Sequence, residues 1–242
     1  MEKMQTSRQR SSAPAADDVS ESLRPAMGGR LHLASSSPRR RELVALTGLA
    51  VVVSAADADE TPRPGESGGE MTRRLARRKA EAPPSGEIVL AADTTVVDGQ
   101  NLIGKPADAD EARRILQDLR GRRHTVVTSI AIRSPDGTVL LDTCESSVPM
   151  RTYRDEDIDR YIARGEPFDK AGAYNILDDG FDPVERDAFG DCYANVMGLP
   201  LCHVVRTLRR IGVEPAADVP AACQRHLRYD CRVFPSILGD AA

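Results

Sequence analysis

The chain has 242 residues, 40% of them hydrophobic and 29% charged, with a formal net charge of -4, and this allows one large domain or two small ones with a sizeable core. The charge balance shows no overall signature of nucleic-acid binding, and no apolar run approaches the roughly 18 residues of a membrane span. We therefore expect the protein to bind neither nucleic acid nor a membrane. Five cysteines, an odd number without metal-ligand spacing, together with no recognisable secretory signal, favour a cytoplasmic location.

The first 28 residues are rich in Ser, Ala, Arg and Asp and almost lack large apolar side chains. Such a composition buries too little surface to offset the entropy lost on ordering, so residues 1–28 are predicted to be a disordered extension. Met27 stands directly before the first strand-like run. We therefore hypothesise that the natural start of the protein lies at Met27.

From Leu31 onward, short apolar runs alternate with amphipathic helices, which is typical of an α/β protein. Ser37 as N-cap, Pro38 at the first helical position and Gly48 after the end delimit the first helix. The predicted helices cover residues 38–47, 70–82, 155–164 and 199–211, with a further one that begins at Asp108. The predicted strands cover 31–35, 125–133 and 138–150, with one around Asp93 that ends in the Asp98-Gly99 turn.

Two segments lack a regular pattern. Residues 165–198 are rich in Gly, Asp and aromatic residues, and a long irregular segment inside a compact domain is more often functional than idle. Residues 214–242 show few periodic signals and are predicted to be a loosely attached C-terminal extension.

Asp93 interrupts the apolar run 88–97, and a carboxylate in a buried strand needs a metal, a cation or hydrogen bonds as its partner.

Residues 99–105 match the GxxxxGK half of a P-loop, but Pro106 stands where a Ser or Thr should hold magnesium, so a P-loop is rejected. Lys105 is instead interpreted as a separate cation able to reach phosphate.

The segment 34–40, ASSSPRR, places Ser35, Ser37, Arg39 and Arg40 at a helix N-terminus, where amides and arginines bind anions. An ordinary capped helix with solvated arginines is the alternative.

Glu60 is a second candidate acid beside Asp93. Two carboxylates from different strand ends resemble a magnesium or manganese site; a solvated loop is the alternative for Glu60.

The segments ASSSPRR, DETPRPGE, RKA, AADTTVV, GKP, GRRHTV, DKAGAY and VMGLPL, in this order, resemble the Maf family of nucleoside triphosphate pyrophosphatases. The resemblance covers about Leu31 to Gly212, so residues 29–213 are predicted to form the family's domain. It implies an α/β fold with an elongated mixed sheet, flanking helices and a cleft between two lobes, a divalent metal (Mg or Mn) as cofactor, and a homodimer. It also implies that Asp93 is the catalytic proton acceptor, that Glu60 and Asp93 lie at the metal, and that the nucleotide pocket is lined by Ser35, Ser37, Arg39, Arg40, Lys79, Thr94 and Lys105.

The expected function is metal-dependent hydrolysis of a nucleoside triphosphate to the monophosphate and pyrophosphate, with removal of non-standard nucleotides as one use. A nucleotide-binding regulator of cell division with little turnover is the alternative. Arg39, Thr94 and Asp169-Lys170 are of the kind found in the dTTP and UTP branch of the family. Leu177, however, stands at a glutamine position of that branch and cannot hydrogen-bond a base edge, so the base preference is left open.

Overall fold

The computed structural model describes residues 30–56, 58–84 and 86–239. The predicted N-terminal extension and Met27 lie outside these residues. The strands are β1 (Leu31–Ala34), β2 (Val51–Ser54), β3 (Ile88–Asp98), β4 (Asn101–Ile103), β5 (Arg123–Arg133) and β6 (Val139–Pro149). The main helices are α1 (Pro38–Ala45), α2 (Gly68–Glu81), α3 (Ala109–Leu119), α4 (Asp155–Ala163), α5 (Tyr193–Val196), α6 (Leu201–Arg209), α7 (Val219–Leu227) and α8 (Phe234–Leu238).

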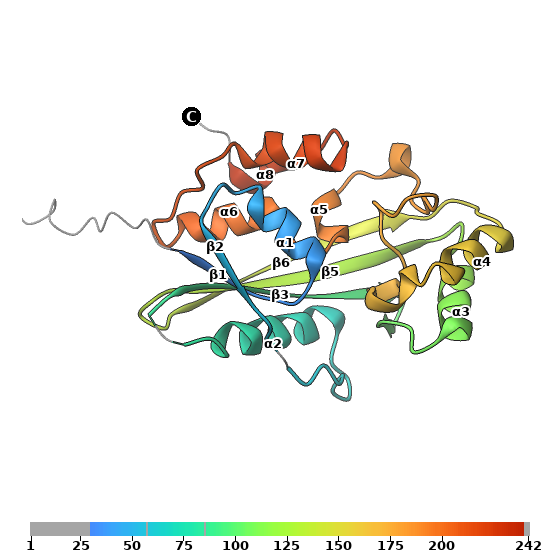
Figure 1. Ribbon diagram of the computed structural model, residues 1–242, viewed down its shortest axis with the longest axis horizontal. Helices are drawn as coiled ribbons and strands as arrows, with labels where there is room; N and C mark the ends of the chain where they lie inside the picture. Colours follow the sequence, from blue (N-terminus) through green and yellow to red (C-terminus); the bar gives the residue numbers. More distant parts are fainter. Residues whose placement is uncertain (1–29, 57, 85, 240–242) are drawn as a thin grey trace, which may run out of the picture.

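The strands of the described residues form a single mixed sheet in the order β2-β1-β3-β5-β6, with β4 also paired to β3. β1 runs parallel to β2 and β3, because helix α1 connects β1 to β2 and helix α2 connects β2 to β3. β3, β5 and β6 are antiparallel neighbours of 11 residues each. Their length gives the molecule its elongated shape (Figure 1). The predicted mixed α/β fold is thus confirmed.

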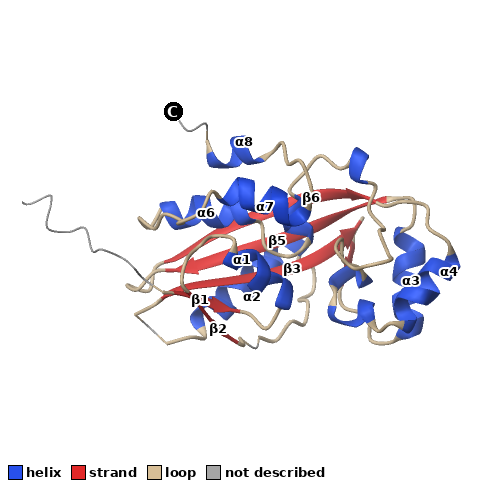
Figure 2. Cartoon of the chain, turned by 45° about the horizontal axis from the view of Figure 1, so that its top comes forward, coloured by secondary structure: helices blue, strands red, loops and turns tan. Residues whose placement is uncertain are grey.

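Helices cover both faces of the sheet (Figure 2). α2 packs closely on one face because its contact residues are small: Ala76 and Ala80 lie against Val89, Ala91 and Ala131. The other face carries the larger core, to which α1, α5, α6 and α7 contribute. α3 and α4 pack together at the far end of the long strands (Figure 1).

Local capping explains where the helices begin. α2 starts two residues before the predicted position because Ser67 and Glu70 form a capping box, with Ser67 N donating to Glu70 Oε2 at 2.9 Å. At α3 the prediction is confirmed: Asp108 Oδ1 accepts from Glu111 N at 2.8 Å. Ser37 caps α1 as predicted, although that helix ends at Ala45 rather than at residue 47.

The prediction of a loosely attached C-terminal segment is wrong for the described part of it. α7 buries Val219, Cys223 and Leu227 in the main core. Tyr229 stacks on Tyr193 with ring centroids 4.5 Å apart. Three apolar residues spaced four apart are enough to dock one face of a short helix, but they form too brief a stripe to stand out in the sequence.

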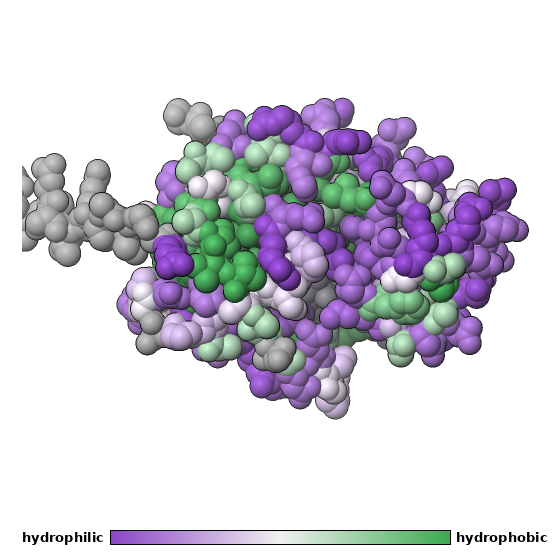
Figure 3. Space-filling model, viewed as in Figure 1, coloured by the Kyte–Doolittle hydropathy of each residue, from purple (hydrophilic) through white to green (hydrophobic). Residues whose placement is uncertain are grey.

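Hydrophobic residues gather on one visible face, over the end of the sheet that carries β2 and α6, and most of the remaining face is hydrophilic (Figure 3). Val53 on the edge strand β2 is 41% exposed. Among the described residues, no helix combines the length and the apolar character needed to cross a membrane.

Candidate functional site

A gap along one edge of β3 creates the candidate site. β1 pairs with β3 only over Ile88–Leu90, and β4 pairs with it only over Val96–Asp98. The stretch 91–95 therefore has a free edge, and a cavity of about 710 Å³ opens beside it. Because side chains alternate along a strand, Asp93 points toward the face covered by α2 and Thr94 toward the face of α1. The cleft can thus draw on side chains from both faces.

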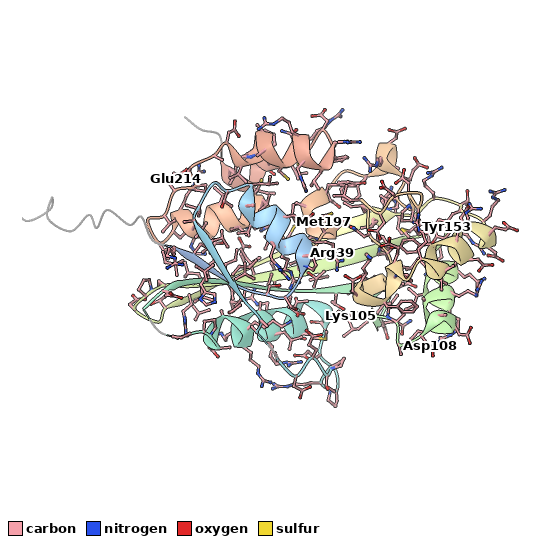
Figure 4. All side chains as sticks on the ribbon, viewed as in Figure 1. Arg39, Lys105, Asp108, Tyr153, Met197 and Glu214 are labelled. Atoms are coloured by element: carbon pink, nitrogen blue, oxygen red, sulfur yellow. The ribbon has the colours of Figure 1, made fainter. Side chains whose placement is uncertain are left out.

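The cleft lies between the part of the molecule that carries α1 and α2 and the part that carries the 3-10 turns η1 (Glu166–Asp169) and η2 (Ala171–Ala173). Figure 4 shows Arg39 from α1, Lys105 from the turn after β4 and Met197 from the turn after α5 gathered around it. All nine predicted site residues line this one cleft: Ser35, Ser37, Arg39, Arg40, Glu60, Lys79, Asp93, Thr94 and Lys105.

Lys79 on α2 joins the two acidic residues of the cleft. Its Nζ lies 2.6 Å from Asp93 Oδ1 and 2.7 Å from Glu60 Oε1. Lys79 and Asp93 are both buried, whereas about half of the Glu60 side chain is exposed. The partner that the isolated acid in the apolar strand required is therefore a lysine, placed there by the packing of α2 on β3.

Burial and charge move the two carboxyl groups in opposite directions. Burial raises the pKa of Asp93 above its usual value, although the charge and hydrogen bond of Lys79 oppose the shift. Burial would also raise the pKa of Glu60, but the hydrogen bond and charge of Lys79, assisted by Lys105 and Arg40, outweigh it and leave this pKa lowered. Asp93 is consequently the stronger base of the pair.

Arg40 forms the wall on the other face of the sheet. Its Nη2 donates to Thr94 Oγ1 at 2.9 Å, and its Nε donates to the Gly198 carbonyl at 2.8 Å. Gly198 has φ +90, which favours glycine, and a Cβ there would crowd Thr94 Oγ1 at 3.2 Å. Burial lowers the pKa of Arg40, opposed by the charge of Asp93, yet an arginine stays protonated in proteins.

The remaining predicted residues differ in how freely they face the cleft. Arg39 donates through Nη1 to Asp169 Oδ2 at 2.8 Å and through Nη2 to the Asp169 carbonyl, so its charge is already paired. The Lys105 side chain is 57% exposed, and its Nζ lies 4.0 Å from Glu60 Oε2, so Lys105 is only loosely paired. Ser35 Oγ and Ser37 Oγ serve local contacts, accepting from the Ser37 and Arg40 backbone amides respectively.

The donor set fits a hard divalent cation that is shared with a substrate. Glu60 and Asp93 supply carboxylate oxygens that already converge on one positive group, the Lys79 ammonium. Magnesium commonly binds one or two carboxylates and takes its other ligands from substrate phosphates and water. Within the described ranges, no group of three or more His, Cys, Asp or Glu side chains could hold a metal. These two acids would therefore hold the ion only together with a ligand.

Two observations depart from the sequence analysis. Leu177 does not line the cleft but packs against the main core, so its expected place at the base-recognition position is not what the structure shows. Asn175, two residues earlier, does line the cleft, as does Tyr174, whose hydroxyl hydrogen-bonds His124 Nε2 at 2.7 Å. Tyr174 ends the family segment DKAGAY, whereas the sequence signal for Asn175 was the irregular, glycine-rich character of 165–198.

Fold and site together define a mixed α/β protein whose described cleft residues include five cations (Arg39, Arg40, Lys79, Lys105 and Lys170) and three acids (Glu60, Asp93 and Asp169). The sequence matches the family described as Maf-like protein over residues 30–211. This chain belongs to the Maf-like protein family, as its motifs predicted.

Curated relatives carry a common name. The chain is 47% identical over 189 residues to the dTTP/UTP pyrophosphatase of Anaeromyxobacter dehalogenans strain 2CP-1, which covers 77% of this chain and 96% of the relative. It is 44% identical over 194 residues to the dTTP/UTP pyrophosphatase of Chromobacterium violaceum, and the match covers 76% of this chain and 96% of that relative. The protein with the same name from Geobacter sulfurreducens is 45% identical over 189 residues, and the match covers 76% of this chain and 97% of that relative.

Among solved structures, the chain is similar to a nucleoside-triphosphatase / dITP/XTP pyrophosphatase from Mycobacterium abscessus, at 19% identity and a TM-score of 0.35. The similarity covers 50% of this chain and 74% of that one. It is too weak to support any statement about the site.

Proposed function

We propose that this cleft hydrolyses a nucleoside triphosphate with a uracil or thymine base, UTP or dTTP, to the monophosphate and pyrophosphate with the help of a divalent metal. The predicted enzyme class, a nucleoside triphosphate pyrophosphatase, is confirmed by the relatives. The observation that carries the proposal is the pair of acids Glu60 and Asp93 held on Lys79 at the free edge of β3.

The charges of the cleft suit a triphosphate. Such a ligand carries about four negative charges near neutral pH, which cations around the reacting centre must balance. Lys79, Lys105 and Arg40 lie around Glu60 and Asp93, and Arg39 becomes available when a phosphate competes with Asp169. A divalent ion held by Glu60 and Asp93 would add positive charge and lower the pKa of water.

In the proposed reaction Asp93 takes the proton of the attacking water. A new bond forms between the water oxygen and the α-phosphorus, the bond from that phosphorus to the bridging oxygen of the β-phosphate breaks, and pyrophosphate leaves. An ordinary aspartate, with a pKa of about 3.9, is a weak base near neutrality. The burial that raises the pKa of Asp93 makes it better suited to this task. Serving as a metal ligand would also require the ionised carboxylate.

The test is a screen of dTTP, UTP, CTP, ATP and GTP, with a modified-base triphosphate included, in which monophosphate and pyrophosphate are both quantified. Each substrate is assayed with magnesium, with manganese and with a chelator. We expect the highest kcat/KM for UTP and dTTP and no turnover with the chelator. Equal rates for all five bases would refute the base preference, and full activity with the chelator would refute the metal dependence.

A further inference from the structure

Asn175 carries an acceptor that nothing in the described structure satisfies. The residue follows η2, lines the cleft and is only 8% exposed. Its Nδ2 donates to Asp178 Oδ1 at 2.8 Å, whereas its Oδ1 is buried without a hydrogen-bond partner in the described part of the chain. Leaving a buried acceptor unpaired costs stability, so this oxygen is ready for a donor that a ligand brings.

The contacts of Asp178 fix which end of the amide is left over. Asp178 Oδ2 accepts from the Tyr161 hydroxyl and lies 3.3 Å from Lys170 Nζ. A carboxylate accepts hydrogen bonds and donates none, so the amide must turn its NH₂ group toward Asp178. The hydrogen bond from Asn175 Nδ2 to Asp178 therefore fixes the orientation of the amide and leaves Oδ1 as the free acceptor. A flipped amide would lose this hydrogen bond.

The backbone before Asn175 is held in an unusual conformation. Gly172 has φ +74 and Ala173 has φ +61, two successive residues in the left-handed region. Gly172 N donates to the Gly104 carbonyl at 3.1 Å, which ties this segment to the turn after β4. Strained backbone of this kind persists only where the surroundings determine it, and it presents Asn175 in one fixed position.

Asn175 follows a turn that packs on apolar residues of the cleft. Val96 and Val126 are cross-strand neighbours, and both line the cleft on the sheet face opposite to Asp93. A Cβ at Gly172 would lie 2.8 Å from Val96 Cγ2 and 3.3 Å from the Tyr174 ring, so the turn before Asn175 packs on this apolar surface. A nucleotide whose phosphates lie at Lys79 and Lys105 would place its flat base here.

We propose that Asn175 Oδ1 accepts the N3–H of a uracil or thymine base and that Asn175 is a specificity-determining residue. The inference rests on the proposed function, because it takes the bound molecule to be a nucleotide. The imide nitrogen of uracil and thymine carries a proton that can satisfy the unpaired oxygen. Cytosine has no proton at that ring position, so it leaves Oδ1 without this partner.

The experiment removes the proposed hydrogen bond in two ways, by N3-methylation of the ligand and by substitution of Asn175 in the protein. Binding of the non-hydrolysable α,β-imido analogue of UTP and of its N3-methyl derivative is measured by calorimetry with magnesium, for the natural chain and for Asn175→Leu. We expect the natural chain to bind the unmethylated analogue about 10- to 100-fold more tightly, as the loss of one buried hydrogen bond implies. In Asn175→Leu the ratio should fall below about threefold.

Leu177→Gln is the matched control, because it alters a nearby residue outside the cleft and should keep the ratio of the natural chain. The inference is overturned if the natural chain does not distinguish the two analogues, if it binds neither, or if Asn175→Leu keeps the full preference. Melting temperatures of both variants are measured alongside. Release of pyrophosphate from UTP is assayed separately: if it is absent while the preference for the unmethylated analogue holds, the proposed hydrolysis fails and the base contact stands.

Discussion

Lys79 is the residue on which the geometry of the acidic pair depends. Replacing it by methionine would leave Asp93 buried without the cation that hydrogen-bonds it and Glu60 without its closest one. Removal of one partner from a buried ion pair is strongly destabilising, and we expect Lys79→Met to lower the free energy of unfolding by about 3 kcal/mol. Urea denaturation in metal-free buffer measures the change.

Arg77→Met provides the control on the same helix. Arg77 also pairs with a carboxylate, Glu81 at 3.8 Å, but both side chains are about half exposed. Exposed pairs contribute little, so this change should cost less than about 0.5 kcal/mol. A loss at Lys79 no larger than the loss at Arg77 would contradict the account of the buried pair.

Asp93 is expected to be indispensable for turnover. Asp93→Asn keeps the size of the side chain but removes the negative charge needed both to accept a proton and to hold a metal. We expect kcat to fall by about 10²- to 10⁴-fold or more, the range for loss of a general base. Asp59→Asn, one residue before Glu60 and outside the lining of the cleft, should retain the natural rate. Natural rates in purified Asp93→Asn would refute the proposed mechanism.

α7 is an integral part of the fold. Leu227 is 1% exposed and packs in the main core. Truncating a buried leucine removes its contacts and leaves a cavity, so Leu227→Ala should cost about 2–5 kcal/mol. Arg225→Ala on the exposed side of the same helix should change stability by less than about 0.5 kcal/mol. Equal, small effects at both positions would restore the view of a loosely attached extension.

His124 on β5 gives the protein a pH-dependent stability term. Burial lowers its pKa to about 4. Between the usual value near 6.5 and about 4, the unfolded chain binds a proton that the folded chain does not, so acidification favours unfolding by about 3 kcal/mol in total. His124→Gln does not titrate, and its free energy of unfolding should fall less steeply with decreasing pH in this window. Identical slopes would contradict the assignment.

At the scale of elements, local patterns predicted most of the fold. The long strands, the Asp98-Gly99 turn and the helices with an apolar stripe are all present. Such features depend on neighbouring residues, which a single sequence displays. The docking of α7 depends on contacts with distant elements such as α5, and Tyr229 just after the helix stacks on Tyr193; the pattern of α7 was too short to reveal these contacts.

The charged residues of the candidate site were predictable, whereas Asn175, which also lines the cleft, was not. Asp93 and Glu60 stand out because acids in apolar surroundings require partners, and the nine predicted residues do line one cleft. Their roles stay predictions. Asn175 comes from an irregular segment whose path is set by tertiary contacts, so spacing along the chain carried no signal for it. Gly198 lies in the family segment VMGLPL, but its contact with Arg40 joins residues far apart in the sequence and was not predicted.

At the scale of the whole molecule, the gap between β1 and β4 along β3 forms the candidate site. It exposes a strand edge between two sheet faces, one with Asp93 and Lys79 and the other with Arg40 and Thr94. A long ligand with a charged and a flat apolar part matches such a cleft. The homodimer, the metal and the cytoplasmic location remain predictions from the sequence.

Hydrolysis of UTP in ¹⁸O-labelled water, with magnesium and with product analysis by mass spectrometry, tests the central claim most directly. Attack of water on the α-phosphorus predicts UMP that carries one ¹⁸O and unlabelled pyrophosphate. Label in pyrophosphate, or UDP and inorganic phosphate as products, would contradict the proposed attack. Tight binding without any product would favour a nucleotide-binding regulator instead.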